Sequence, residues 1–271
     1  MKKIDLHIHT QYSDGIFTLE EILQRATALR LQELAITDHD TIINLQRYKE
    51  LSLKYGIRII PGIESATDIK GMHILGYGIQ DFDGIETFMN HYRNLNKAGA
   101  EKTIELLKED GVNISVEQVE QIMTATIISK RDITRFMVKM GYATNTYEVY
   151  QNFIGNGHRA YVPVYKIPTE ELLEIISTSG GIAVLAHPYT LKMDTNFDLL
   201  IPYLKNLGLK GIETQSNRHT SEQKEFFSKI AKKYDLVETA GSDFHHSDDG
   251  NDLGVEVEDD FLNNFHKFLS I

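Results

Sequence analysis

Histidine and carboxylate motifs recur at the ends of short β-like segments along the whole chain. The first motif, His7-Ile8-His9, ends an apolar run that begins near Ile4. The later motifs follow the same rule, and they are SDG at 13–15, ITDHD at 36–40, GIE at 62–64, AHP at 186–188 and GSDFH at 241–245. Imidazoles and carboxylates at the same ends of several strands indicate a metal site, so the fold must bring these strand ends to one rim.

The order of the predicted elements indicates an α/β fold. Apolar and β-branched runs predict strands at 3–9, 31–37, 57–62, 73–77, 182–186, 209–213 and 236–240. Helical patterns lie between most of them, and Thr18 and Thr220 each begin a predicted capping box. This alternation favours parallel strands joined by crossover helices, and seven strands predict an α/β barrel.

The middle of the chain has a different pattern. Residues 85–155 read as helical almost throughout, with a long helix ending near Gly111 and shorter helices at 116–123, 132–140 and 146–153. We therefore expect an inserted helical subdomain at 95–165. The barrel would then consist of residues 1–94 and 166–271.

Composition narrows the function classes. The 271 residues include no cysteine, so thiolate metal sites and a cysteine nucleophile are excluded. The formal net charge of −11 argues against an extended nucleic-acid track or an anionic membrane surface as partner. No apolar stretch is long enough for a signal peptide or a membrane span, and we expect a soluble cytoplasmic protein.

The candidate ligands share their position after strands. Residues i and i+2 of a strand point to the same side, so His7 and His9 can face one ion. The histidines at strand ends are His7, His9, His39, His73, His187 and His245, and the carboxylates are Asp14, Asp38, Asp40, Glu64 and Asp243. Two of these carboxylates have simpler alternatives, a tight turn at Asp14 and a helix N-cap at Asp40. Carboxylates that converge on one cavity need cations, and this donor mixture suits Zn, Mn or Fe.

Together, the motifs resemble those of the PHP domain family of metal-dependent phosphoesterases. The resemblance rests on DLHIHT at 5–10, SDG, ITDHD, GIE, HILGYG at 73–78, AHPY at 186–189 and GSDFH. It implies a distorted seven-stranded α/β barrel that holds two or three divalent ions. The implied ligand sets are His7, His9, Glu64 and Asp243 for the first ion, Glu64, His73 and His187 for the second, and Asp14, His39 and His245 for the third.

The subgroup that the chain most resembles carries a helical insertion and acts on small phosphate monoesters, including nucleotides. The resemblance therefore implies a small phosphorylated substrate, with the insertion as a lid. Many of these relatives have a GRPHIA-like segment where this chain has Ser129 to Thr134. Asp132 replaces the usual histidine, while Lys130 and Arg131 keep the basic character that would bind a substrate phosphate or, alternatively, form a solvated helix start.

The expected chemistry is hydrolysis by a hydroxide that bridges two ions. Asp40, His219 and a metal-bound water are the candidates for the leaving-group acid. Other members of the family trim RNA or DNA ends or hydrolyse histidinol phosphate, so a 5'–3' exonuclease and a histidinol-phosphate phosphatase are alternative functions. A metal-stabilised scaffold without turnover is the non-enzymatic alternative.

Overall fold

The computed structural model describes residues 1–123, 128–191, 194–246 and 252–269. The chain forms two compact units, which we call the barrel unit (Met1–Met89 and Ile167–Ile271) and the helical unit (Asn90–Lys166). The insertion expected at 95–165 falls inside the second unit.

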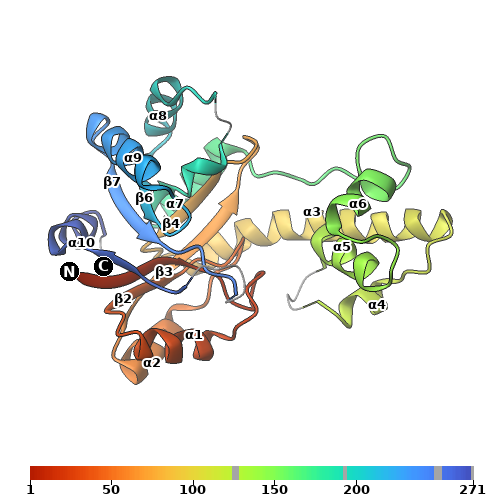
Figure 1. Cartoon of the computed structure of the whole chain (residues 1–271), viewed down its shortest axis with the longest axis horizontal. Coiled ribbons are helices and arrows are strands. Elements are labelled where there is room, and N and C mark those ends of the chain that lie inside the picture. The colour runs from red at the N-terminus through yellow and green to blue at the C-terminus, as the bar shows by residue number, and fades with distance from the viewer. Residues whose placement is uncertain (124–127, 192–193, 247–251, 270–271) are drawn as a thin grey trace. The chain divides into compact units, whose positions relative to one another are not determined.

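One sheet forms the centre of the barrel unit (Figure 1). Among the described residues it has eight strands in the order β7-β6-β5-β4-β3-β2-β1-β8. The strands are β1 (Lys2–Ile8), β2 (Glu33–Ile36), β3 (Arg58–Ala66), β4 (His73–Tyr77), β5 (Ile182–Leu185), β6 (Leu209–Ser216), β7 (Val237–Gly241) and β8 (Val255–Val257). The α/β barrel is confirmed, and the short strand β8 is an addition to the seven predicted strands.

Strands β1 and β7 meet at the seam of the barrel sheet. Beside the His7 and His9 motif, Ile8 and Phe244 form a parallel bridge, and the Asp243 amide donates to the His7 carbonyl at 2.9 Å. At the beginning of β1, β8 pairs antiparallel with it from Lys2 to Ile4. Among the described residues, this edge of β1 therefore has two partners, β8 at Lys2 to Ile4 and Phe244 at Ile8.

Strand β4 corrects the expectation of parallel pairing. It runs antiparallel to both β3 and β5. Residues 67–72 alone connect it to β3, and this connection is too short for a crossover helix. Because β4 is reversed, His73 at its beginning pairs with Ala66 at the end of β3 and lies level with the carboxyl ends of the other strands.

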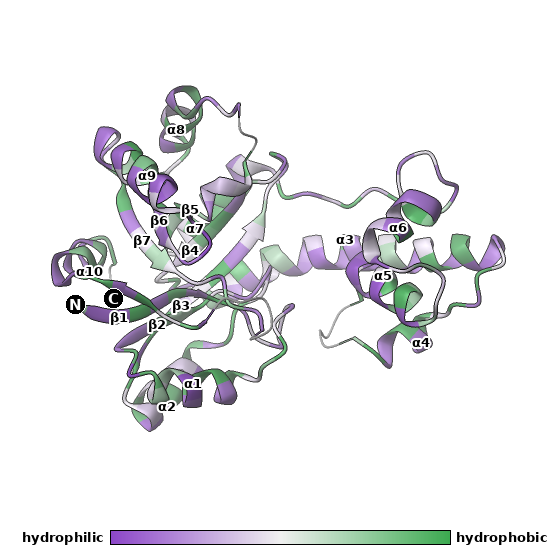
Figure 2. Ribbon diagram, viewed as in Figure 1, coloured by the Kyte–Doolittle hydropathy of each residue, from purple (hydrophilic) through white to green (hydrophobic). Residues whose placement is uncertain are grey.

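The helices of the barrel unit are α1 (Leu19–Ala28), α2 (Leu45–Tyr55), α7 (Thr169–Thr178), α8 (Phe197–Asn206), α9 (Ser221–Lys233) and α10 (Asp259–His266). The two predicted capping boxes are confirmed, because Thr18 pairs reciprocally with Glu21 and Thr220 with Gln223. Figure 2 shows hydrophobic and hydrophilic residues mixed along α1 and α9, as expected for helices with one buried face.

Away from the histidine rim, apolar side chains of the strands form buried clusters with the helices. Leu6, Val184 and Phe265 belong to one buried cluster, to which α10 also contributes Leu262. The Tyr77 hydroxyl crosses this cluster and donates to the Leu6 carbonyl at 2.7 Å. A second cluster packs α1 and α2 against β1 and β2. This packing fixes the strands and leaves their polar ends at the rim.

The helical unit has its own core. Helix α3 (Phe82–Glu109) begins in the barrel unit and continues into the helical unit, which also contains α4 (Val116–Glu120), α5 (Lys130–Lys139), α6 (Thr146–Val149) and the π-helical turn Tyr150–Ile154. Ile104 of α3 and Phe136 and Met137 of α5 are buried together. Among the described residues, no helix combines the length and the apolar character needed to cross a membrane.

Candidate metal centre

All nine predicted ligands lie at one rim of the barrel unit. Each comes from the end of a strand or the loop next to it: His7 and His9 from β1, Asp14 from the following loop, His39 after β2, Glu64 in β3, His73 in β4, His187 after β5, and Asp243 and His245 after β7. Glu64 lies inside β3, not after it as the sequence indicated, because β3 continues to Ala66 where it pairs with β4.

The first group contains His7, His9, Glu64 and Asp243. His7 Nε2 and His9 Nε2 lie 3.2 and 3.1 Å from Glu64 Oε2. They lie 3.5 and 3.4 Å from Asp243 Oδ1. His7 Nε2, His9 Nε2 and Glu64 Oε2 are buried, and within the described part of the chain they make no hydrogen bond. Donor atoms that converge in this way without hydrogen bonds fit a divalent cation.

The second group forms around the other oxygen of Glu64. His73 Nδ1 lies 2.9 Å and His187 Nε2 lies 2.8 Å from Glu64 Oε1. His39 also approaches, with Nδ1 3.4 Å from Glu64 Oε2. The geometry therefore offers either His39 or His187, together with His73 and Glu64, to a second ion.

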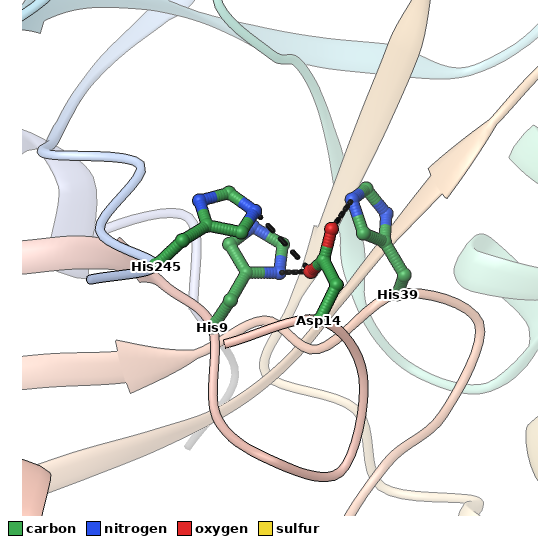
Figure 3. A group of neighbouring side chains, drawn as sticks. All are labelled: His9, Asp14, His39 and His245. Atoms are coloured by element: carbon green, nitrogen blue, oxygen red, sulfur yellow. Dashed lines mark ion pairs between the residues drawn. The ribbon is translucent and has the colours of Figure 1, made fainter. Parts of the chain in front are cut away.

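The third group is centred on Asp14 (Figure 3). Asp14 Oδ1 lies 3.2 Å from His245 Nε2, and Asp14 Oδ2 lies 3.8 Å from His39 Nε2. His9 joins them through Nδ1, 3.6 Å from Asp14 Oδ1. The turn at Asp14 is tight as well, since a Cβ at Gly15 would lie 2.4 Å from the His9 carbonyl oxygen. His9 therefore faces two groups, whereas the resemblance implied only the first.

Buried imidazoles and carboxylates of the rim shift one another's pKa values. Burial lowers the pKa of His7, but nearby carboxylates, first Glu64 and then Glu213, outweigh burial and raise it well above its usual range. Burial likewise raises the pKa of Glu64, and the imidazoles of His39 and His7 outweigh burial and hold it well below its usual range. Divalent cations would offset the carboxylate charge while the coordinating imidazoles stay neutral, so the donor set fits metal ions.

Two buried carboxylates contact a predicted ligand or the loop that carries one. Asp38, expected among the carboxylates of the cavity, instead accepts hydrogen bonds from the Thr10 amide at 2.7 Å and the Ser13 hydroxyl at 2.6 Å. It thereby organises the loop that carries Asp14. Glu213 of β6, which the sequence analysis did not single out, lies 3.2 Å from His7 Nδ1. Its position at the end of the predicted strand 209–213 is the sequence feature that indicates a rim residue.

The two predicted acid residues differ in their surroundings. The Asp40 amide donates to the Glu64 carbonyl at 2.8 Å, and Asp40 has a positive φ of 53°. Asn44 is the N-cap of α2, so the alternative that Asp40 caps this helix is wrong. His219 is buried, and burial lowers its pKa. Its Nδ1 lies 3.0 Å from the Thr214 carbonyl, which requires a proton on Nδ1 in the neutral ring.

Arg218 is a rim residue that the sequence analysis missed as a site residue. Its Nε lies 3.1 Å from Asp243 Oδ2, and its Nη2 donates to the Asp243 carbonyl at 3.1 Å. The signal was its place next to His219, in the loop after β6. Arg218 brings a permanent positive charge to the edge of the first group.

Lys130 and Arg131 lie at the beginning of α5 in the helical unit. Lys130 Nζ donates to the Val162 carbonyl and lies 5.3 Å from the centre of the Tyr161 ring. Asp132, where the family resemblance implied a histidine, accepts from the Ser129 amide at 2.9 Å and completes a capping box. The carboxylate at this position thus stabilises the start of α5. The phosphate-binding role of Lys130 and Arg131 stays a prediction.

Known proteins of similar sequence act on phosphate esters. A phosphoribosyl 1,2-cyclic phosphate 1,2-diphosphodiesterase of Eggerthella lenta is 31% identical over 248 residues, covering 89% of this chain and 93% of that protein. A 5'-3' exoribonuclease of Haemophilus influenzae is 29% identical over 264 residues, covering 95% of both. A 3',5'-nucleoside bisphosphate phosphatase of Chromobacterium violaceum is 27% identical over 267 residues, covering 94% of this chain and 91% of that protein.

Solved structures and the family comparison agree with the geometry. A chain from Bifidobacterium adolescentis matches with a TM-score of 0.81 at 24% identity, covering 99% of this chain and 96% of that chain. An amidohydrolase from Chromobacterium violaceum with bound sulfate matches with a TM-score of 0.78 at 25% identity, covering 96% of each. The sequence matches the PHP domain over residues 5–235. The chain therefore belongs to the PHP domain family and is a metal-dependent phosphoesterase.

Proposed function

We propose that this phosphoesterase hydrolyses phosphate monoesters of small, nucleotide-like substrates. The observation that carries the proposal is the convergence of nine imidazole and carboxylate side chains on one rim, with Glu64 between two groups and Asp14 in a third. The similarity to a nucleoside bisphosphate phosphatase supports a small nucleotide as substrate. The net charge of −11 favours a small anion over a long polyanion.

Two or three ions of Mn, Zn or Fe held by these groups would lower the pKa of a coordinated water and offset charge on the phosphoryl oxygens. Arg218, beside Asp243, is placed to orient a phosphoryl oxygen, and Lys130 and Arg131 are proposed to bind substrate phosphate. Asp40, His219 and a metal-bound water are the candidates for the leaving-group acid; His219 would have to donate through Nε2, because its Nδ1 faces the Thr214 carbonyl.

The test is phosphate release by the purified protein loaded with Mn, Zn or Fe. The panel contains nucleoside monophosphates, a 3',5'-nucleoside bisphosphate, a cyclic sugar phosphate, histidinol phosphate and an aryl phosphate. We expect the nucleotide monoesters to be hydrolysed with the highest kcat/KM. The proposal fails if metal-loaded protein leaves every monoester intact.

A 5'-3' exoribonuclease is the second candidate, and the helical unit favours it. Arg131, Arg135 and Lys139 are exposed and spaced four residues apart, so they form a basic stripe along one face of α5. The helical unit contains ten of the 28 Lys and Arg residues but only eight of the 39 Asp and Glu residues, whereas the barrel unit is strongly acidic. Tyr147 and Tyr150, which follow α5 in the chain, are exposed. Exposed aromatic rings of this kind stack on nucleic-acid bases.

Charge reversal in the stripe separates the two candidates. The double variant Arg135→Glu/Lys139→Glu is compared with the unaltered protein on a mononucleotide and on a 5'-phosphorylated oligoribonucleotide. An exoribonuclease would lose at least about tenfold in kcat/KM on the oligonucleotide while its mononucleotide activity stays unchanged. Equal activity of the two proteins on both substrates would count against an RNA track on α5.

A further inference from the structure

We infer that Glu213 is a positioning residue that fixes ligands of two different metal ions at once. The inference rests on the proposed metal-binding role of the rim. Glu213 lies on β6 and is fully buried. Its two carboxylate oxygens contact the ring of His7 and the backbone of His187, which belong to the first and second ligand sets.

The contact with His7 sets which ring nitrogen is available to an ion. His7 Nδ1 lies 3.2 Å from Glu213 Oε1 and 3.4 Å from Oε2. A carboxylate accepts but cannot donate, so when an ion replaces the second ring proton of His7, the remaining proton is held on Nδ1. The unprotonated Nε2 then faces Glu64 and Asp243, where the first ion would bind.

The contact with His187 stabilises an unusual backbone. The His187 amide donates to Glu213 Oε2 at 2.7 Å. His187 has φ 20° and ψ 64°, a conformation that side-chain-bearing residues rarely adopt and that surrounding contacts must hold. With the backbone held in this way, His187 Nε2 lies 2.8 Å from Glu64 Oε1. Glu213 therefore positions one ligand through its ring and another through its main chain.

The neighbouring strand leaves space for this arrangement. A Cβ at Gly241 of β7 would lie 2.3 Å from His7 Cβ and 2.8 Å from Glu213 Oε1. In the part of the chain that the structure describes, Glu213 has no ion pair with Lys or Arg. Burying a carboxylate costs free energy, and the contacts of Glu213 with the two ligand residues offset that cost.

The experiment compares Glu213→Gln with Glu238→Gln as the matched control. Glu238 lies on β7 beside β6 and accepts from the Thr214 and Ser228 hydroxyls at 2.7 and 2.5 Å. It is not among the candidate ligands or their contacts. Each protein is titrated with Mn²⁺, and anomalous scattering from Mn²⁺-loaded crystals reports the occupancy of each group.

We expect Glu213→Gln to weaken Mn²⁺ affinity by about tenfold to 100-fold. The loss should fall on the groups containing His7 and His187, while the group around Asp14 keeps its ion. Glu238→Gln should bind Mn²⁺ as the unaltered protein does. Glu213→Asp, which keeps the charge on a shorter side chain, should recover part of the affinity.

A folded Glu213→Gln protein with unchanged Mn²⁺ affinity and occupancy would overturn the inference. Failure of both Glu213 variants to fold in metal-free buffer, with Glu238→Gln folded, would overturn it as well, because it would assign Glu213 to the core alone. The proposed function is tested separately by the unaltered protein. If that protein binds no Mn²⁺, Zn²⁺ or Fe²⁺, the proposed metal-dependent mechanism is wrong, whatever the Glu213 variants show.

Discussion

At the scale of single residues, His9 connects two of the three groups. Its Nε2 faces Glu64 and Asp243, and its Nδ1 faces Asp14. A neutral imidazole can bind only one ion through an unprotonated nitrogen, so a proton on Nδ1 would direct His9 to the first ion. Removing this ring should therefore disturb both groups, the first by loss of a ligand and the third by loss of a partner of Asp14.

His9→Ala should reduce kcat by more than about 100-fold and lower the bound metal, because a direct ligand matters at least as much as a residue that orients one. Metal analysis and steady-state kinetics of the same sample provide the measurement. His158→Ala is the control, since His158 Nε2 contacts the Gln151 carbonyl in the helical unit. Unchanged kcat alongside reduced metal content would mean that the lost metal is structural and takes no part in turnover.

Gly241 is a second residue on which the rim depends. Gly241→Ala places a methyl group against His7 and Glu213 and should destabilise the protein by about 1–3 kcal/mol through overpacking. Urea unfolding gives the free energy. Gly99→Ala is the control, because its Cβ would lie 3.5 Å from Val162 Cγ1 and the change within α3 should stabilise the helix by up to about 1 kcal/mol. Equal effects of the two substitutions would contradict the steric argument.

At the scale of elements, local sequence signals predicted which segments form strands and helix caps, but they did not predict how the strands pair. All seven predicted strands and both capping boxes are present because apolar runs and Thr-x-x-Glu or Thr-x-x-Gln patterns act within a few residues. The predicted parallel direction of β4 is wrong, because strand direction depends on distant pairing partners and the short connection at 67–72 leaves no room for a crossover helix. The strand β8 was missed because it has three residues and needs β1 as its partner.

The cap of α1 provides an element-scale prediction. The Thr18 hydroxyl accepts from the Glu21 amide at 3.2 Å, while the Glu21 carboxylate accepts from the Thr18 amide at 2.8 Å. Thr18→Ala should lower the free energy of unfolding by about 1 kcal/mol without changing kcat. Thr87→Ala is the comparison, since the Thr87 hydroxyl donates to the Asp83 carbonyl inside α3 and caps no helix end. A change in metal affinity of Thr18→Ala would contradict a purely local role.

At the scale of the whole molecule, charge couples metal binding to stability. The rim gathers carboxylates and imidazoles inside the protein, where an unpaired charge costs free energy. Ions that bind only the folded state stabilise it by mass action, by about 2.7 kcal/mol per site at a free concentration of 100 times Kd. The metal-free protein is therefore expected to be folded but less stable than the loaded protein.

Chelation tests this coupling. Treatment with EDTA followed by its removal should abolish phosphoesterase activity and lower Tm, and added Mn²⁺ should restore both. Differential scanning calorimetry and phosphate release follow the two properties in parallel. The same treatment of His9→Ala serves as the control and should shift Tm less, because fewer ions are bound at the start. Full activity in EDTA would contradict metal dependence.

The sequence by itself determined the strands, most helices and the residue types of the rim, because hydrophobic periodicity, capping and motif spacing are local properties. Only the tertiary structure decided which atoms meet. The reversal of β4 places His73 at the rim, the β1 and β7 seam brings Asp243 to His7, and β6 delivers Glu213 to both His7 and His187. These encounters depend on strand order and register, which arise from packing across the whole barrel and from no short stretch of sequence.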